Sequence, residues 1–253
     1  MREILLFTLW APLAAMGEVA VGERRVGLGR PGRSALLGLV AAALGIERRD
    51  EAAHAALEQG YGLALRVEAE GTLLQDYHTA QVPAAKRGKR WPTRRAELAE
   101  AGLETILSLR EYRADARHTP ALWTRPGAPH PLADLARALR RPRFTLYFGR
   151  KACPLGLPPA PRIVAADTLT EAFASFDAEM PEAERDLRRR RMLLPHAGPV
   201  HADADAREWL GEGLKLRRIE RRRDAIVSRR RWQFGLRDEL IALPVHPTEG
   251  TPS

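Results

Sequence analysis

Four side chains of this sequence are of the types that perform acid–base chemistry without a metal ion. They belong to Tyr77, His78, His118 and Lys151. A phenol, two imidazoles and an amine can donate and accept the protons that metal-free cleavage of RNA requires. The four residues form no motif of fixed spacing. Cleavage by this set is therefore kept as an alternative, and no catalytic residue is predicted.

A metal site or a bound cofactor is not expected. The histidines are scattered, and none belongs to an H-E-x-x-H or Cys/His pattern. His196 and His201 lie near Asp203 and Asp205, but this stretch contains Pro and Gly and is interpreted as a surface loop. Cys153, the single cysteine, excludes a cysteine-based zinc site and an internal disulfide. Its isolation is typical of a reducing compartment, so we expect a cytoplasmic protein.

Residues 27–32 read GLGRPG, a literal G-x-G-x-x-G pattern. In a dinucleotide-binding fold these glycines follow the first strand directly, whereas here the first predicted strand ends near Trp10. Pro31 also stiffens the loop, so a dinucleotide site is not predicted. What remains is an arginine-bearing loop that leads into a helix N-terminus, where backbone N–H groups and guanidinium groups favour phosphate. A solvated, flexible loop is the alternative. The loop arginines are Arg24, Arg25, Arg30 and Arg33.

Two further segments concentrate positive charge without acids. Residues 86–95, KRGKRWPTRR, surround Trp91, and residues 137–151 interleave six cations with Phe144, Tyr147 and Phe148. Cations between aromatic rings suit a single-stranded nucleic acid, because phosphates meet the charges and bases stack on the rings. For Phe144 and Phe148 we expect core packing. The arginine-rich stretches 185–191 and 217–223 are mixed with acids and are interpreted as solvated helix faces.

The overall charge agrees with a polyanionic partner. The net charge of +9 favours nucleic acid first and an anionic membrane surface second. Residues 1–17 have the outline of a secretory signal, but Glu3 cancels Arg2, and the apolar run is also typical of a buried strand. No apolar run reaches the length of about 18 residues that spans a bilayer.

The elements that must position these residues alternate in a regular order. Strands are predicted over 2–10, 61–69, 72–79, 118–124 and 143–149, and helices over 35–45 (with Ser34 as N-cap), 50–59 and 131–141. This order predicts an α+β, ferredoxin-like or RRM-like βαββαβ domain with an antiparallel sheet, over residues 1–150.

Two segments lie outside this βαββαβ order. Residues 80–110 interrupt the domain as an inserted basic thumb, because so long an insertion is typical of a functional protrusion. Residues 151–253 are predicted to form a smaller, β-rich C-terminal region. It begins with a strand–helix unit over 162–175 and ends in a flexible tail.

Several blocks of the sequence match a known family. The most specific are LREYRADARHTPALW at 109–123 and RPRFTLYFGRKACPLGLP at 141–158. GRPGRSALLGLVAAALGIERRD, DYHTAQVPAAKRGKR and RRRDAIVSRRRWQFGLRDE support them in the same order. Together they resemble the CasD-type subunits of type I-E CRISPR Cascade, in the RAMP superfamily of RRM-like RNA-binding proteins, over about residues 1–240.

The resemblance implies an RNA-binding role in antiviral defence. Such a subunit holds the 5′ handle of the CRISPR RNA, caps the foot of the backbone filament, and contacts the adjacent backbone subunit and the large subunit. It meets target DNA indirectly through the complex and binds no membrane. The thumb would wedge against the guide next to the handle. In type I-C relatives the corresponding subunit is a processing endoribonuclease, which is the alternative function here.

The sequence departs from the family pattern at three places. The first loop has Met16 before Gly17 where the family commonly has Trp, so one ring is absent. Gly32 and Ala35 flank Arg33 and Ser34 where Thr and Gly are usual, and His118 replaces an aromatic residue. The predicted RNA-binding residues are Arg30, Arg33, Tyr77, His78, Lys86, Arg87, Lys89, Arg90, Trp91, Arg110, Arg143, Tyr147, Arg150 and Lys151.

Overall fold

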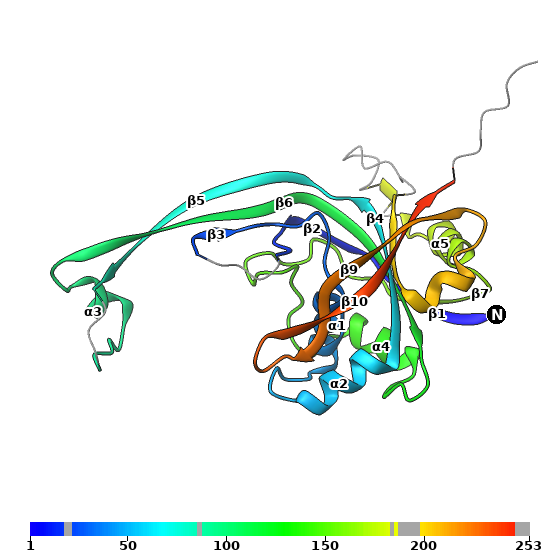
Figure 1. Cartoon of the computed structure of the whole chain (residues 1–253), viewed down its shortest axis with the longest axis horizontal. Helices are drawn as coiled ribbons and strands as arrows, with labels where there is room; N and C mark the ends of the chain where they lie inside the picture. The colour runs from blue at the N-terminus through cyan, green and yellow to red at the C-terminus, as the bar shows by residue number, and fades with distance from the viewer. Residues whose placement is uncertain (18–21, 85–87, 183–184, 187–197, 246–253) are drawn as a thin grey trace, which may run out of the picture.

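The computed structural model describes residues 1–17, 22–84, 88–182, 185–186 and 198–245. One large, mostly antiparallel sheet runs through the body, and a long two-stranded arm projects from it (Figure 1). The sheet order is β7-β1-β6-β4-β8-β10-β9, and β2, β3 and β5 pair with β6 outside this path. The strands are β1 (Arg2–Leu6), β2 (Leu9–Ala14), β3 (Arg24–Arg25), β4 (Tyr61–Ala69), β5 (Thr72–Pro83), β6 (Leu103–Thr124), β7 (Arg162–Ala166), β8 (Val200–Asp203), β9 (Leu214–Ser228) and β10 (Gln233–Pro244).

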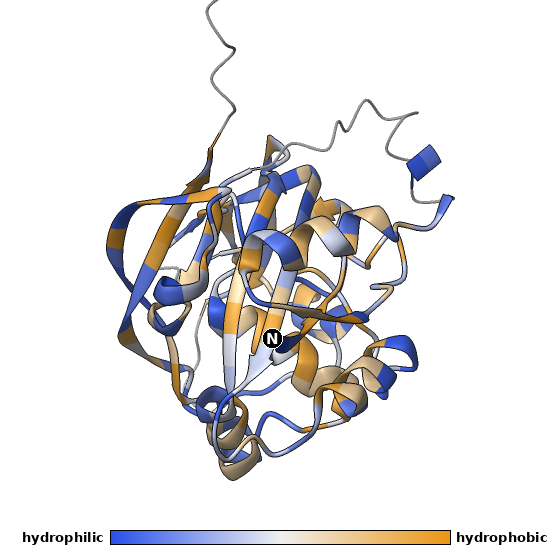
Figure 2. Cartoon of the chain, turned by 90° about the vertical axis from the view of Figure 1, so that its right-hand side faces the viewer, coloured by the Kyte–Doolittle hydropathy of each residue, from blue (hydrophilic) through white to orange (hydrophobic). Residues whose placement is uncertain are grey.

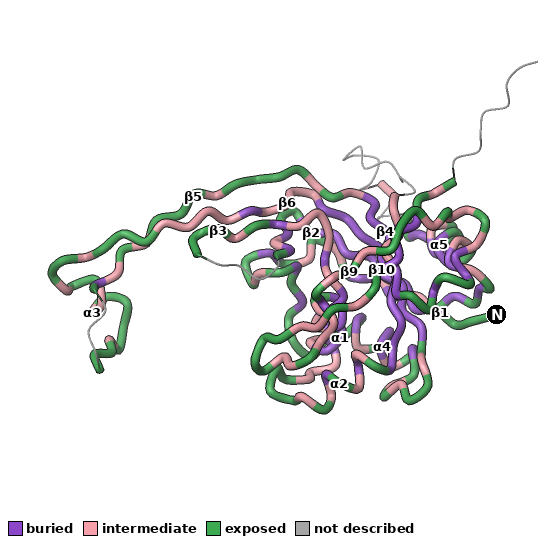
Figure 3. Tube along the Cα trace, viewed as in Figure 1, coloured by how far each residue is buried: buried purple, intermediate pink, exposed green. Residues whose placement is uncertain are grey.

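The helices cover both faces of the sheet. They are α1 (Arg33–Leu44), α2 (Glu51–Gly60), α3 (Arg94–Leu98), α4 (Leu132–Arg140), α5 (Leu169–Ala178) and the 3-10 helix η1 (Ala204–Trp209). Strand β1 shows why its sequence is continuously apolar. Leu5 joins the core cluster that contains α1 and α4, while Ile4 and Leu6 point to the cluster formed with α5 and η1. Alternate residues of a strand face opposite sides, so a strand between two cores carries no polar face. The body is buried along these strands, whereas the arm is largely exposed (Figure 3).

The strand predicted over 2–10 is divided into β1 and β2. The pairings Leu6↔Ala121 and Leu9↔His118 keep one register with β6 across the break. The break lies opposite Pro120, which accepts a hydrogen bond from the Phe7 N–H but has no N–H of its own to return. The sequence therefore predicted an extended segment here correctly, but it missed the break between β1 and β2.

The thumb predicted over 80–110 is the outer half of a much longer hairpin. Strands β5 and β6 are paired from Thr72↔Ala114 to Pro83↔Leu103, and α3 lies near the tip. Twelve residues of β5 span about 40 Å at the usual rise of a strand. The strands predicted over 72–79 and 118–124 are thus parts of β5 and β6. The sequence placed their boundaries too close to the body.

The strand predicted over 143–149 is wrong. The N–H groups of Arg143 and Phe144 donate to the carbonyls of Ala43 and Ala42, so this segment is anchored on the C-terminal end of α1. The position beside β1 is taken by β7 instead, in antiparallel pairing from Arg2↔Ala166 to Leu6↔Arg162.

The C-terminal region continues the same sheet. Strand β7 and helix α5 form the strand–helix unit expected over 162–175, and β8 joins the sheet by pairing with β4. The division at residue 150 stays a prediction. Residues 217–223, expected as a helix face, are part of β9, while residues 187–191 lie outside the described residues. Hydrophobic ribbon segments concentrate in the interior of this body (Figure 2).

Candidate nucleic-acid interface

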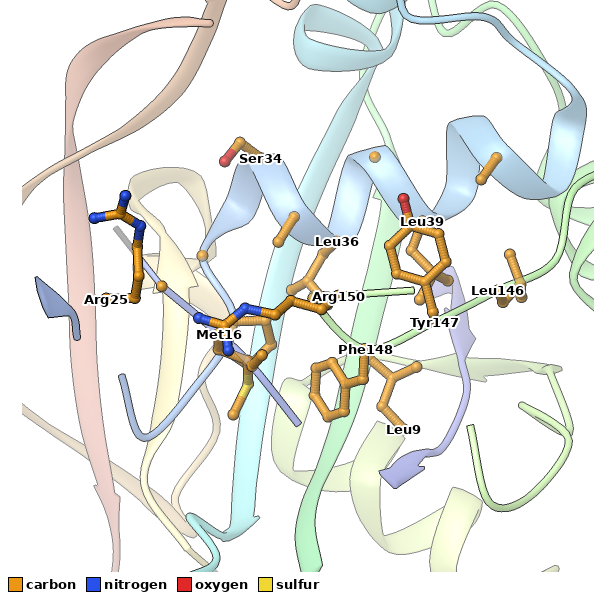
Figure 4. Close-up of a pocket in the computed structure, with 18 of the residues that line it drawn as sticks. Leu9, Met16, Arg25, Ser34, Leu36, Leu39, Leu146, Tyr147, Phe148 and Arg150 are labelled. Carbon is orange, nitrogen blue, oxygen red and sulfur yellow. The ribbon is translucent and has the colours of Figure 1, made fainter. Parts of the chain in front are cut away.

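A cavity of about 540 Å³ lies beside the N-terminal half of helix α1 and is called the cleft below. It is lined by β2 and the loop after it, the stretch around β3, α1 and the loop before it, Glu111 of β6, the loop over 145–150 and the β9–β10 hairpin. Figure 4 shows Arg25, Tyr147 and Arg150 around this space with Met16 and Phe148 at its apolar base. The cleft therefore combines basic, aromatic and apolar side chains.

The N-terminus of α1 carries an internal anion. Its N-cap is Gly32, not Ser34, and no side chain of the cap residue accepts a hydrogen bond. Instead, the Asp224 carboxylate on β9 accepts the Arg33 N–H at 2.7 Å. A Cβ on Gly32 would lie 2.8 Å from the Asp224 Oδ2 atom, so the glycine permits this approach. The phosphate site predicted at this helix end is thus already occupied by a carboxylate of the chain.

Arg33 and Arg30 are structural residues. The Arg33 side chain is 2% exposed, and its guanidinium contacts the Glu58 carboxylate (2.9 Å), the Asp203 carboxylate and the Tyr61 carbonyl (2.8 Å). It cannot reach a phosphate without leaving these partners, so its RNA-binding role stays a prediction that this geometry does not favour.

Arg30 is 11% exposed and makes two hydrogen bonds to the Glu239 carboxylate. Burial lowers its pKa, and the Glu239 charge opposes that shift. Together Arg30 and Arg33 join the loop before α1 to strands β8 and β10. Arg30, like Arg33, is therefore engaged by a carboxylate of the chain, and its RNA-binding role stays a prediction.

Two arginines of the cleft have no carboxylate partner among the described residues. Arg150 lies with its Cζ 4.6 Å from the Tyr112 ring centroid, and its buried Nη1 has no hydrogen-bond partner within the described chain. Arg229 donates one long bond, 3.4 Å, to the Ser34 carbonyl, and its buried Nε is likewise unpartnered there. Burial, and then the charge of Arg48, lower the Arg229 pKa. A guanidinium stays charged in proteins, so these groups favour an anionic ligand.

An aromatic ring adjoins these cations at the turn between β9 and β10. Trp232 is 52% exposed, and the guanidinium carbons of Arg48 and Arg229 lie 4.5 and 4.8 Å from its ring centroid. Its φ of 59° is unfavourable for a tryptophan. Phe234 contacts the same ring edge-to-face at 5.7 Å. An exposed ring next to cations is a suitable platform for a nucleobase.

The ring predictions for residues 144–148 are confirmed in part. Tyr147 lines the cleft and is 38% exposed, so its ring is accessible, and its RNA-binding role stays a prediction. Phe148 is buried and packs edge-to-face against His118, which confirms its place in the core. Phe144 is 42% exposed, so its predicted core packing is wrong. Arg143 and Lys151 are exposed beside this segment.

The remaining predicted residues that the structure describes lie on the arm, apart from the cleft. Tyr77 and His78 are exposed on β5, and Arg110 lies on β6 opposite Asp76. Lys89 and Trp91 both bind the Glu100 carboxylate, so the charge of segment 86–95 is partly neutralised from outside the segment. Arg90 is exposed, and Lys86 and Arg87 lie outside the described residues.

The acid–base set is not assembled. Tyr77 pairs with Leu109, nine residues from His118 along β6, which corresponds to about 30 Å at the rise of a strand. His118 is fully buried, and burial lowers its pKa to about 3, so its imidazole is neutral at pH 7. In the part of the chain that the structure describes, no three His, Cys, Asp or Glu side chains are grouped as metal ligands. Of the described helices, none has the length and apolar character to cross a bilayer.

Sequence reasoning missed Arg229 and Trp232, whereas Arg25 was named among the loop arginines. The signal for Arg229 and Trp232 was available, because residues 229–234 read RRRWQF, with three cations, two rings and no acid. That stretch resembles 86–95 in composition, yet no binding role was predicted for it.

Comparisons with known proteins agree with this description. A family model described as CRISPR-associated protein (Cas_Cas5) matches residues 4–238. The chain is 37% identical over 169 residues to the CRISPR system Cascade subunit CasD of Escherichia coli (strain K12), covering 62% of this chain and 70% of that protein.

Two solved structures share the fold. The first, titled CRISPR RNA-guided surveillance complex, has a TM-score of 0.58 and 23% identity and covers 97% of this chain and 95% of that one. The second, titled Crystal structure of Cas protein, has a TM-score of 0.55 and 23% identity, with 95% of each chain covered.

Proposed function

Since this chain belongs to the CRISPR-associated protein (Cas_Cas5) family, we propose that it is the Cascade subunit that holds the 5′ handle of the CRISPR RNA. The observation that carries the proposal is the cleft, where Arg150 and Arg229 each keep an unpartnered buried N–H within the described chain. Phosphates of a single strand would bind these two groups. Bases would stack on Tyr147 and Trp232, which lie at the same cavity.

The acidic side chain that lines the cleft, Glu111, already has partners within the chain. Glu111 lines the cavity and accepts the Gly27 N–H at 2.8 Å, with Arg24 at 4.0 Å from its carboxylate. That backbone hydrogen bond lowers the Glu111 pKa. A carboxylate with these partners repels an RNA phosphate less than a free one would, so the cleft keeps a positive balance.

The arrangement of the central strands supports an RRM-like platform. Taken along the chain, β1, α1, β4, β6, α4 and β7 follow a βαββαβ order, and the four strands lie as β7-β1-β6-β4. Each neighbouring pair in this set is antiparallel. We infer a ferredoxin-like core extended by β8, β10 and β9. Its last strand is β7 rather than the segment over 143–149.

The arm supports a role at the end of a filament. Its exposed apolar side chains include Leu73, Leu74, Tyr77 and Ile106. An exposed hairpin with so many apolar side chains gains stability when another surface covers it. We infer that the arm contacts the adjacent backbone subunit and the guide, while the body meets the large subunit. The cleft would meet target DNA only indirectly, through the assembled complex.

Binding without cleavage is the proposed outcome for the RNA. Neutral, buried His118 is about 30 Å along the sheet from Tyr77, so the residues of the endoribonuclease alternative do not meet. Incubation of the purified chain with a repeat-containing RNA in chelator should leave the RNA intact for hours. Cleavage at one site that His78→Ala abolishes would establish the alternative instead.

The handle assignment is tested by the RNA that the protein retains. The chain is co-expressed with the other Cascade subunits and a CRISPR array, and the bound RNA is sequenced. Discrete guides with one common 5′ end support the proposal, whereas bulk cellular RNA contradicts it. In the same assay, Arg150→Ala with Arg229→Ala should release the guide, while Arg137→Ala with Arg141→Ala, which removes equal charge from the exposed end of α4, should not.

A further inference from the structure

The strand at the outer edge of the sheet carries a row of basic side chains that the cleft does not use. Strand β9 is last in the sheet order, so one side of its backbone has no neighbouring strand among the described residues. Its exposed cations, called the edge row below, are Lys215, Arg217, Arg218, Arg221 and Arg223. Arg223 is six residues from Arg229, or about 20 Å along the strand. The edge row is therefore separate from the cleft, although both belong to one hairpin.

The edge row is only partly neutralised. Arg218 pairs with Glu220 at 2.6 Å, and Arg221 lies 3.9 Å from Asp238. In the described chain no carboxylate pairs with Lys215, Arg217 or Arg223. Arg223 makes a single long bond, 3.4 Å, to the Phe234 carbonyl.

The inward-facing charged side chains of β9 and β10 pair with one another, so they do not neutralise the edge row. Arg222 and Arg237 face Asp224, at 3.4 and 2.6 Å, inside the body. At least three positive charges are thus exposed along one open edge.

The spacing and composition of the row distinguish between nucleic-acid partners. Residues 214–223 contain no aromatic side chain, so no platform exists there for unstacked bases. From Lys215 to Arg223 the strand rises about 27 Å, the length of about eight phosphates along one strand of a duplex. Cationic side chains that have no aromatic neighbours bind the phosphate backbone rather than the bases. The N–H groups of an edge strand can add hydrogen bonds to the same phosphates.

We propose that the edge row of β9 binds the phosphate backbone of double-stranded DNA directly, independently of sequence. Three exposed cations of this edge strand, Lys215, Arg217 and Arg223, have no carboxylate partner in the described chain and are available to the phosphates of a duplex. Such contacts would bring duplex DNA to the molecule without competing for the cleft. The inference does not depend on which RNA occupies the cleft.

A different role is also available to charged residues on an edge strand. Lys and Arg there prevent edge-to-edge pairing between copies of a protein. The protective role and the DNA-binding role predict different experimental results. Loss of protective charge produces self-association, whereas loss of phosphate contacts lowers DNA affinity and its dependence on salt.

The test uses the full chain and a 30-base-pair DNA duplex of arbitrary sequence, with binding followed by fluorescence anisotropy across a salt series. We expect Lys215→Gln/Arg217→Gln/Arg223→Gln to weaken duplex binding at least tenfold. The slope of log affinity against log salt should become shallower by about 2.7, from three lost contacts at about 0.9 each. Single-stranded RNA binding, measured in parallel, should change less than twofold because the cleft is intact.

The matched control removes the same charge elsewhere. Arg137, Arg141 and Arg207 are exposed on α4, just after it and on η1, and their triple replacement by Gln should leave the duplex slope within about 0.5 of wild type. Equal slopes for the two triple variants would overturn the proposal. So would self-association of the edge-row variant in sedimentation with unchanged duplex binding by its monomer.

A single variant that adds net positive charge tests the same surface. Asp238 is an exposed acid beside Arg221, and Asp238→Asn should tighten duplex binding by about threefold without altering RNA binding. Unchanged or weaker duplex binding by this variant contradicts the proposal. Loss of RNA binding with retained duplex binding, in any variant, would count against the function proposed for the cleft and leave the edge row supported.

Discussion

The Asp224 carboxylate accepts the backbone N–H of Arg33 across 191 positions of sequence, at 2.7 Å. This bond closes the N-terminus of α1 with an acid from β9. The same carboxylate pairs with Arg237 at 2.6 Å. One buried side chain thus joins the first helix of the chain to the last hairpin. The wall of the cleft that contains Arg229 and Trp232 is held in place through this hairpin.

Replacement of Asp224 should therefore destabilise the body. Asp224→Ala leaves the Arg33 N–H and the Arg237 guanidinium without their acceptor, and we expect the free energy of unfolding to fall by about 3 kcal/mol. The midpoint of urea denaturation measures this. Asp238→Ala removes an exposed acid from the same hairpin and should change stability by less than about 0.5 kcal/mol. Equal effects of the two variants would show that the Asp224 contacts do not stabilise the fold.

His118 should make stability dependent on pH. Burial lowers its pKa to about 3, while an unfolded histidine has a pKa near 6.5. Between these two pH values the unfolded chain binds one more proton at this residue. Stability attributable to His118 therefore falls as pH falls from about 6.5 toward 3, by at most about 1.4 kcal/mol per pH unit.

The variant His118→Phe isolates this effect. A phenyl ring can pack against Phe148 in the same core position and does not titrate, so the variant should unfold with a weaker dependence on pH between 6 and 4. His78→Phe, at an exposed site on the arm, is the matched control and should retain the wild-type dependence. Identical pH profiles for wild type and His118→Phe would contradict the buried, neutral imidazole.

Trp232 should contribute stacking energy to RNA binding. Trp232→Ala is expected to weaken binding of a single-stranded RNA by about 1–3 kcal/mol, and Trp232→Phe by less, because a smaller ring still stacks. Trp232→Gly should lose the same affinity without loss of stability, since glycine adopts the positive φ freely. Phe144→Ala removes another exposed ring and should leave RNA affinity unchanged. If it is as harmful as Trp232→Ala, the rings act through the fold and not through the bases.

The tip of the arm should be dispensable for folding of the body. Pro83 and Leu103 are paired, so residues 84–102 can be replaced by an Asn-Gly turn that keeps the remaining register. We expect unchanged thermal unfolding for the isolated chain, and impaired assembly with the guide RNA and the other Cascade subunits. Trypsin should cut first between Lys86 and Arg95 in the free chain, and assembly should protect these sites. An unfolded body after the replacement would show that the tip is structural.

The sequence predicted the elements whose signals are local. Residues 50–60 contain an acidic N-cap followed by an amphipathic turn, and α2 begins after Asp50, whose side chain accepts the Ala53 N–H. Strands β4 and β5 were recognised from their alternation around Gly71, which has a φ of 76°. Family membership was also evident from blocks of residues, because it depends on the order of amino acids alone.

Only the tertiary structure decided which arginines are available to a ligand. Arg30, Arg33, Arg150 and Arg229 have the same local signature of cations near loops and rings. Arg30 and Arg33 are neutralised by Glu239 and Asp203, which lie 209 and 170 positions away. Arg150 and Arg229 meet no such acid in the described chain. The energy of an ion pair depends on the separation and burial of its two charges in space. A sequence specifies the charges, but their distances exist only once the sheet has brought β8, β9 and β10 against the first helix.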